Sequence, residues 1–354
     1  MAYSVSASFF LFCVLLIPLA SGAHVYQCSP GTEPTLCIVN NLAYTSGQDP
    51  LPQVTRLDAV NRIQLRCSRY YYYTKWNSYA SKDVLQVYDA LLHSKVLRNP
   101  RSATVINCHL RTLVMPQDLE VGDFFNNNVH VVETDPAQSY NVRYLDLSHN
   151  NLNDLGNLSV LVNLETLKLE GNAFVEIKPE TFARLSNLSV LNLGYNHILK
   201  IDLKVLPKTL TTLSLIKNSL TEIDFTSVSF TMMSELDVER NVLTGLDVAS
   251  LMRACPALHM LPIEYNPIPK NEAQRIVKEL AKNNVTYYNE GDKASDSDSS
   301  CDSDEYQIER ACFSIPETKG SGSFLKAFVL ILIVVVLLGV FGLSARWIWY
   351  EMRY

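Results

Sequence analysis

The chain has 354 residues, of which 36 are acidic and 30 basic, and its formal net charge is −6. This balance excludes the strongly basic composition of most nucleic-acid-binding proteins, so no nucleic acid is expected among the partners. The apolar share of 47% is ordinary for a globular protein, but a large part of it lies in one stretch near each end of the chain.

Residues 1–23 predict a secretory signal peptide. The apolar stretch FFLFCVLLI is followed by a helix breaker at Pro18 and by small residues at Ser21 and Ala23. The apolar core is too short to span a bilayer, which disfavours a membrane anchor. Cleavage after Ala23 would leave His24 as the first residue of an exported protein.

Residues 24–60 predict a small N-terminal cap, in which Cys28 and Cys37 enclose eight residues and form a local disulfide. Residues 61–139 contain strand-like segments such as RIQLRC and ATVINCHL, which we interpret as degenerate copies of the repeat that follows. The spacing of these segments between 110 and 140 is too short for a whole repeat, so at least one register there is irregular.

Residues 140–270 repeat the pattern L-x-x-L-x-L-x-x-N-x-L six times in succession. The L-x-L core predicts a short strand whose alternate side chains point to opposite faces. One such unit cannot bury its apolar face alone, but a stack of units can. The second apolar position of the pattern falls at Leu145, Leu167, Leu191, Leu213, Leu236 and Leu261.

An asparagine follows each of these predicted strands. The chain turns at this point and leaves backbone groups inside the coil, where an amide side chain can satisfy them. Stacked coils would align the amides into a structural ladder of Asn150, Asn172, Asn196, Asn218, Asn241 and Asn266.

The outward positions of the strands form a candidate ligand-binding surface, because arrays of this kind bind partners on their concave sheet. Glu235, Asp237 and Glu239 are predicted to point outward, so reversal of their charges is expected to leave folding intact. The candidate ligand-binding residues are Asp146, Lys168, Asn192, Glu235, Asp237, Glu239 and Glu264.

Residues 271–290 predict a C-terminal cap with a helix, since Ile276, Val277 and Leu280 recur at helical spacing. Residues 291–323 predict a solvated acidic stalk, because the segment DKASDSDSSCDSDE has a strongly negative charge and no core residues. Its acids do not have the spacing of an EF-hand loop, so no metal site is predicted.

Residues 324–345 predict one transmembrane helix. The uncharged run from Ala327 to Ala345 reaches ~28 Å as a helix, which is about the hydrocarbon thickness of a bilayer. Residues 346–354 form a short cytoplasmic tail of interfacial anchors. With the signal peptide, this predicts a single-pass type I protein of the plasma membrane with an extracellular N-terminus. A lipid anchor is the competing interpretation, because GSGS at 320–323 offers small residues before the apolar run.

Seven cysteines remain after removal of the signal peptide. An odd number in an exported chain leaves a free thiol or an intermolecular bond, so a disulfide-linked or lateral oligomer is considered. The second predicted local disulfide joins Cys301 and Cys312. The other three cysteines lie in or next to apolar repeat positions, where we expect buried small hydrophobes. They are Cys67, Cys108 and Cys255.

Three N-x-S/T sequons predict N-glycosylation at Asn157, Asn187 and Asn284. Each lies outside the predicted strands, where a glycan would not disturb stacking.

The repeat spacing resembles that of the leucine-rich repeat superfamily. This resemblance implies an α/β leucine-rich repeat solenoid, a curved parallel sheet with N- and C-terminal caps, joined here to the one predicted transmembrane helix. Cys108 falls at the ladder position, where the family also accepts cysteine. The short irregular repeats, single span and small tail are similar to insect leucine-rich repeat membrane proteins, including transmembrane members of the mosquito immune family.

The sequence contains no H-E-x-x-H, G-x-S-x-G or P-loop motif, so neither an enzyme nor a cofactor is expected. The resemblance implies extracellular recognition or adhesion. We therefore expect a non-catalytic cell-surface recognition protein or co-receptor in innate immunity, whose ectodomain binds a protein or microbial ligand or another co-receptor. A cell-adhesion or developmental scaffold protein is the alternative.

Overall fold

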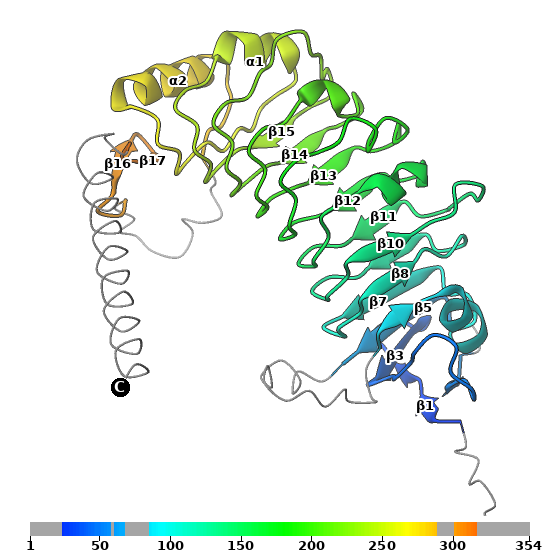
Figure 1. The fold of residues 1–354 in the computed structure, drawn as a ribbon. Coiled ribbons are helices and arrows are strands. Elements are labelled where there is room, and N and C mark those ends of the chain that lie inside the picture. The colour runs from blue at the N-terminus through cyan, green and yellow to red at the C-terminus, as the bar shows by residue number, and fades with distance from the viewer. Residues whose placement is uncertain (1–22, 58–59, 68–84, 289–300, 317–354) are drawn as a thin grey trace, which may run out of the picture.

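The computed structural model describes residues 23–57, 60–67, 85–288 and 301–316. They form a curved solenoid whose main sheet lies on the inner side of the arc (Figure 1). Its strands are β1 (Val25–Gln27), β2 (Ser29–Pro30), β3 (Leu36–Asn40), β4 (Gln53–Thr55), β5 (Arg62–Arg66), β6 (Val87–Tyr88), β7 (Ser102–Ile106), β8 (Thr112–Val114), β9 (Val121–Asp123), β10 (Val131–Glu133), β11 (Tyr144–Asp146), β12 (Thr166–Lys168), β13 (Val190–Asn192), β14 (Thr212–Ser214), β15 (Glu235–Asp237), β16 (Glu305–Ile308) and β17 (Ala311–Ser314). Its helices are the π-helical turn η2 (Leu92–Val96), the 3-10 turns η3 (Gly156–Val160) and η4 (Leu203–Val205), and the α-helices α1 (Val248–Ala254) and α2 (Lys270–Lys282).

The main sheet has ten strands in the order β15-β14-β13-β12-β11-β9-β7-β5-β3-β2. All neighbours pair in parallel except β2 and β3. The register aligns the inward leucines, since Leu167 pairs with Leu145 on one side and with Leu191 on the other. All three are fully buried, so one apolar core runs along the array. The predicted curved parallel sheet is confirmed.

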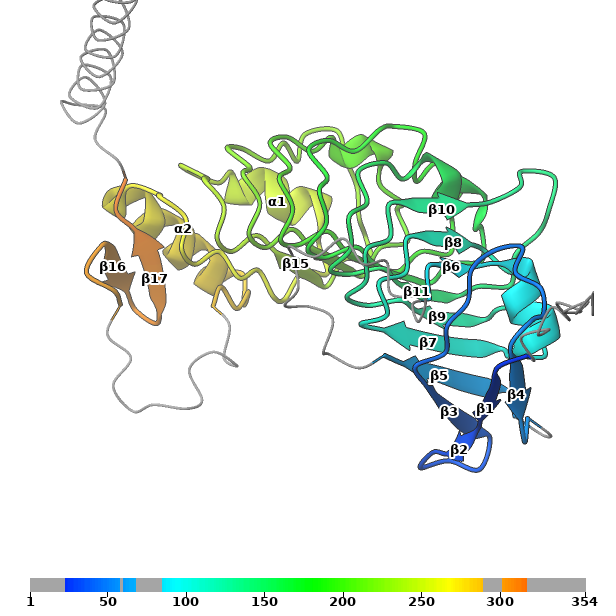
Figure 2. The same cartoon turned by 60° about the horizontal axis from the view of Figure 1, so that its bottom comes forward.

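A second parallel sheet, in the order β10-β8-β6, accompanies the N-terminal coils (Figure 2). Each of these coils therefore contributes two short strands, one to each sheet. The irregular register between 110 and 140 is resolved by β9, whose Gly122 pairs with Leu145 and with Ala103. The leucine pattern is missing there because glycine stands at position 122, where the regular strands have leucine. The ring of Phe124 occupies that part of the core, and a Cβ atom on Gly122 would lie only 2.9 Å from it.

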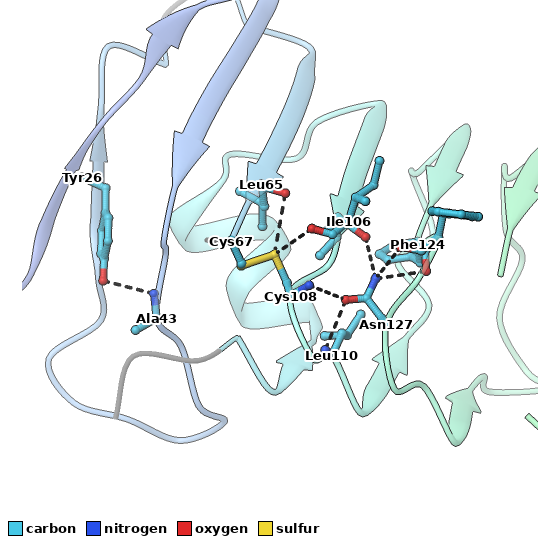
Figure 3. Close-up of a disulfide and its surroundings, with 11 residues drawn as sticks. Tyr26, Ala43, Leu65, Cys67, Ile106, Cys108, Leu110, Phe124 and Asn127 are labelled. Atoms are coloured by element: carbon cyan, nitrogen blue, oxygen red, sulfur yellow. Dashed lines mark hydrogen bonds between the residues drawn. A yellow bond between two sulfur atoms is a disulfide. The ribbon is translucent and has the colours of Figure 1, made fainter. Parts of the chain in front are cut away.

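The N-terminal cap contains the antiparallel pair β2–β3, the separate parallel pair β1–β4, and the predicted Cys28–Cys37 disulfide. A third disulfide joins Cys67 to Cys108 (Figure 3), which corrects the expectation that these two residues are separate buried hydrophobes. The reason is tertiary: β5 and β7 pair in parallel, so the residues just beyond their ends meet, with Cα atoms 5.0 Å apart.

The C-terminal end is closed by α2, which buries Ala273, Ile276, Val277 and Leu280. The antiparallel hairpin β16–β17, tied by the predicted Cys301–Cys312 disulfide, joins this cap. Its attachment is through the backbone, since Tyr265 N donates to Cys312 O at 2.8 Å and Ser314 N donates to Asn266 O at 3.2 Å. Residues 301–316 therefore belong to the folded end of the solenoid, which corrects their assignment to a solvated stalk.

Among the residues that the structure describes, no helix has the length and apolar character needed to cross a bilayer. The transmembrane helix predicted at 324–345, the tail at 346–354 and nearly all of the predicted signal peptide lie outside the described residues.

Candidate binding surface of the concave sheet

Each regular coil turns out of its strand around a ladder asparagine. Asn196 Nδ2 donates to the carbonyl oxygens of residues 169, 193 and 194 at 2.9 to 3.1 Å, and its Oδ1 accepts from Phe174 N at 3.2 Å. The same four-bond arrangement surrounds each of the other five predicted asparagines. The amides thus satisfy carbonyl groups of two successive coils and hold them in register.

Sequence reasoning missed a seventh asparagine in this arrangement, Asn127. Its Nδ2 donates to the carbonyl oxygens of Val105, Phe124 and Phe125, and its Oδ1 accepts from Cys108 N at 2.8 Å (Figure 3). The signal that could have found it is spacing: Asn127 follows Phe124 by three residues, as each regular asparagine follows the last inward residue of its strand.

Four outward residues meet at the centre of the concave sheet, and we call Asp123, Tyr144, Asp146 and Lys168 the central cluster. Asp146 on β11 pairs with Asp123 on β9 and with Lys168 on β12. Lys168 Nζ lies 3.8 Å from Asp146 Oδ2 and 5.4 Å from the centre of the Tyr144 ring. Tyr144 also donates its hydroxyl hydrogen to Asp146 Oδ2 at 3.3 Å.

The charges of the central cluster are coupled. Burial raises the pKa of Asp123, and the charge of Asp146 acts in the same direction. The pKa of Lys168 is raised by its hydrogen bond with Tyr144 and by the carboxylates of Asp146 and Asp123. One cation is therefore held charged beside two carboxylates, and its side chain is still 40% exposed to solvent.

Asn192, Glu170 and His149 extend this polar surface. Asn192 Nδ2 donates to Glu170 Oε2 at 3.0 Å, and His149 Nε2 lies 3.6 Å from Glu170 Oε1. Asp146 and Asn192 also accept from the backbone two residues on, at Ser148 N and Gly194 N respectively. Asp146, Lys168 and Asn192 of the predicted surface thus lie together, and the structure adds Asp123, Tyr144, Glu170 and His149 to them.

The acidic end of the predicted surface differs from expectation. Glu239 is 1% exposed and Glu264 is 2% exposed, whereas Glu235 and Asp237 are half-buried. The hairpin contributes to this burial, because Cys312 N donates to Glu264 Oε1 at 3.1 Å. The expectation that Glu239 and Glu264 face a ligand is therefore corrected. Glu235 and Asp237 lie on β15, three strands beyond β12, so they are separate from the central cluster.

The three sequon asparagines are exposed and lie outside the strands of the main sheet. The amide nitrogens of Asn157 and Asn187 donate to Val132 O and Val162 O of the preceding coils. The described residues contain one cluster with the geometry of metal ligands, formed by Cys301, Glu305 and Cys312. Its two sulfur atoms are bonded to each other, so they are not available as thiolate ligands.

Comparison with family models places the repeats. Residues 162–206 match a model described as leucine rich repeat, and residues 141–161 match a second model of the same description. Residues 141–206 are leucine-rich repeats.

Leucine-rich repeat-containing protein 4 of Homo sapiens is 46% identical over 52 residues, which cover 15% of this chain and 8% of that protein. Leucine-rich repeat-containing protein 4B of Mus musculus is 42% identical over 62 residues, 18% of this chain and 9% of that protein. The match therefore spans less than a tenth of these relatives.

Solved structures of leucine-rich repeat proteins are also similar. The structure of the LRIM1/APL1C complex has 14% identity and a TM-score of 0.46, covering 91% of this chain and 77% of the other. That of the leucine-rich repeat domain of APL1B has 16% identity and a TM-score of 0.46, with 75% and 80% covered. The TLR13–ssRNA13 complex has 21% identity and a TM-score of 0.46, with 61% and 29% covered.

Proposed function

We propose that this chain is a non-catalytic recognition protein of the cell surface that binds a protein partner through its concave leucine-rich repeat sheet. The observation that carries the proposal is the central cluster on a curved, solvent-facing sheet, in which Lys168 lies beside Asp146 and Tyr144, and Asp146 pairs in turn with Asp123. Tyrosine rings and partly exposed charges on a rigid sheet are typical of protein-binding surfaces, and leucine-rich repeat arrays generally act as binding scaffolds.

An extracellular location fits the cysteines. Three disulfides occur in the described residues, and disulfides persist in oxidising compartments. The proposed topology remains a signal peptide at 1–23, one span at 324–345 and a short inner tail. Glycans at Asn157, Asn187 and Asn284 would occupy exposed positions away from the concave strands.

The odd cysteine count suggests a disulfide-linked oligomer, but the free thiol in the described residues is buried. Cys255, the one free thiol among the described residues, is fully buried. A disulfide through it to a second chain would require local unfolding, so we do not retain the disulfide-linked oligomer. A lateral oligomer or a co-receptor complex, formed by non-covalent contacts, remains part of the proposal.

The test uses the full chain on the surface of cells that express it. Surface cross-linking followed by mass spectrometry identifies the bound proteins, and each is then measured against the variant Lys168→Glu. Lys204→Glu is the matched control, because Lys204 is an exposed lysine on η4, outside the main sheet. We expect Lys168→Glu to reduce partner binding and Lys204→Glu to leave it unchanged. Equal binding by both variants, at equal surface levels, would refute the concave site.

The immune and adhesive roles use the same surface and differ in expression. Induction of the transcript and of partner binding by microbial challenge supports the role in innate immunity. Constant expression at cell–cell contacts supports an adhesion or scaffold protein.

A further inference from the structure

A cleft of about 590 Å³ lies at the N-terminal end of the solenoid. One wall is formed by residues 49–56, including β4, and the other by Lys95, Val96 and Arg98 at the end of η2. Figure 2 shows β4 beside the η2 turn at this end of the molecule. No residue of the main sheet lines it, so it is distinct from the concave surface. Its size is within the range of ordinary ligand sites.

The cleft is basic. Arg56, Lys95 and Arg98 line it from its two walls, and Asp49 is the one acidic residue in the lining. All three basic residues are exposed, although the chain as a whole has a net charge of −6. Arg56 and Lys95 form no ion pair with any residue in the described part of the chain. Their charges are therefore available to a ligand.

The backbone of β4 offers a second kind of contact. Among the described strands, β4 pairs with β1 alone. Gln53 N donates to His24 O and Thr55 O accepts from Cys28 N, so the peptide groups of these two residues face β1. In a parallel ladder the residue between them directs its N–H and C=O to the opposite edge. Val54 thus directs its N–H and C=O away from β1, and no described strand pairs with them, although Val54 itself is only 6% exposed. Leu51, Pro52 and Val96 line the cleft beside it.

We propose that this cleft binds an extended acidic peptide segment of a partner protein. Carboxylates of the segment would pair with Arg56, Lys95 and Arg98, while its backbone extends the β1–β4 sheet at Val54. A sulfated polysaccharide is the other anionic ligand to consider. The sheet edge and the apolar floor favour the peptide, because a polysaccharide would use neither. The proposal does not depend on the concave site.

The predicted signal cleavage would add to this chemistry. Ala23 lines the cleft, so cleavage after it would place the α-ammonium group of His24 at the edge of the cleft. This cation would strengthen the attraction for carboxylates without any change in the two walls.

The test titrates two labelled peptides into the full chain. One has the sequence of residues 292–305 with Cys301→Ser, and the other alternates Glu and Val, which places its carboxylates on one face of an extended strand. Neutral copies replace every Asp by Asn and every Glu by Gln. We expect at least one acidic peptide to bind at a single site. Its neutral copy should bind at least tenfold more weakly, and added salt should weaken the binding of the acidic peptide.

The site is located by Lys95→Glu, alone and combined with Arg56→Asn. Asparagine suits residue 56, whose φ of 63° is left-handed, so this change removes charge without new backbone strain. We expect the double variant to bind at least tenfold more weakly, because two cations that pair with the carboxylates of the peptide are lost, whereas Lys168→Glu binds as the parent does. The melting temperature of each variant checks that folding is retained, and Lys95→Glu alone changes one exposed side chain.

Three outcomes would overturn the proposal: no acidic peptide binds, the neutral copies bind equally well, or Lys95→Glu leaves binding unchanged. If a heparin fragment binds this cleft while both peptides fail, the ligand class is wrong. Loss of peptide binding in Lys168→Glu would move the site to the concave sheet.

Discussion

The N-terminal and C-terminal halves of the solenoid join successive coils by different means. From β11 to β15 every coil contributes one strand, and a ladder asparagine bonds each coil to the one before it. Before β11 the coils contribute strands to two sheets, and a disulfide joins Cys67 to Cys108, which stands at the position where the regular coils have asparagine. An amide that bonds two coils and a covalent link between coils are alternative solutions to the same problem, which is fixing a turn inside the core.

The N-terminal half also buries a polar network that has no counterpart in the regular half. His93 Nδ1 lies 2.8 Å from the Tyr88 hydroxyl, and His93 Nε2 lies 2.8 Å from Asp118 Oδ1. His93 is 2% exposed, so both ring nitrogens depend on these partners. The irregular coils therefore add specific contacts to the ladder bonds of Asn127, whereas the regular coils repeat the ladder bonds alone in this role.

Removing the Cys67–Cys108 disulfide tests this contrast with the largest effect. The bridge spans 41 residues, and a loop of this length corresponds to about 4 kcal/mol of unfolding free energy. We expect Cys67→Ser with Cys108→Ser to destabilise the N-terminal coils first, measured by hydrogen exchange in each half. The pair Cys28→Ser and Cys37→Ser, which opens a loop of 9, is expected to cost less. Uniform loss of protection along the solenoid would contradict independent joining of the halves.

Charge reversal at the acidic end should separate buried from exposed acids. Glu239→Lys is expected to destabilise the protein by about 3 kcal/mol, because it places a cation in a position that is 1% exposed. Glu235→Lys, at a half-buried position on β15 in the same coil, is the control and should unfold close to the parent. The melting temperatures of the two variants check this. Equal melting would mean that Glu239 is accessible after all.

Loss of one ladder amide should have a smaller effect. Asn196→Leu leaves three carbonyl groups and Phe174 N–H without this partner, and we expect a cost of about 1–3 kcal/mol and reduced secretion. Asn127→Leu should cost about as much in the irregular half, because its amide bonds are equivalent. His197→Leu, at the exposed neighbouring position, is the control. Unchanged yield and unchanged melting of Asn196→Leu would refute the ladder role.

Acidification should weaken the N-terminal half selectively, and this loss of stability should be the smallest of the predicted effects. Burial lowers the pKa of His93, an effect that the charge of Asp118 partly opposes. The unfolded state then binds more protons below pH 6.5, so the contribution of neutral His93 to stability is present above its ordinary pKa of about 6.5 and is lost progressively as the pH falls from there through the lower pKa of the folded state. Hydrogen exchange between pH 7.5 and 5 should show this loss before β11. In His93→Gln the pH dependence of this half should flatten.

The regular coils could be predicted because each needs only local information. A leucine at every second strand position and an asparagine three residues after the last of them specify a coil that stacks on an identical neighbour, as at Leu191, Leu193 and Asn196. Asn127 obeys the same spacing, but Gly122 and Phe124 replace the two leucines, so the pattern was not recognised. The ladder geometry is therefore present at Asn127 although the leucine pattern is absent from this coil.

The central cluster could be predicted only in part. Asp146, Lys168 and Asn192 follow from strand alternation, since each occupies the same outward position of its coil. Asp123 does not, because its place beside Asp146 depends on the register of an irregular strand. The error at Glu239 and Glu264 has a different origin: alternation gives the direction of a side chain, but burial depends on what packs over it.

The sequence by itself determined the repeating coil, its inward leucines and its buried amides, because these depend on residues that are close together in the chain. The tertiary structure decided what distant segments do to each other: the Cys67–Cys108 bond across stacked strands, the hairpin at 301–316 on the last repeat, and the basic cleft between β4 and η2. These contacts join residues tens of positions apart, and no local periodicity encodes which of them will meet.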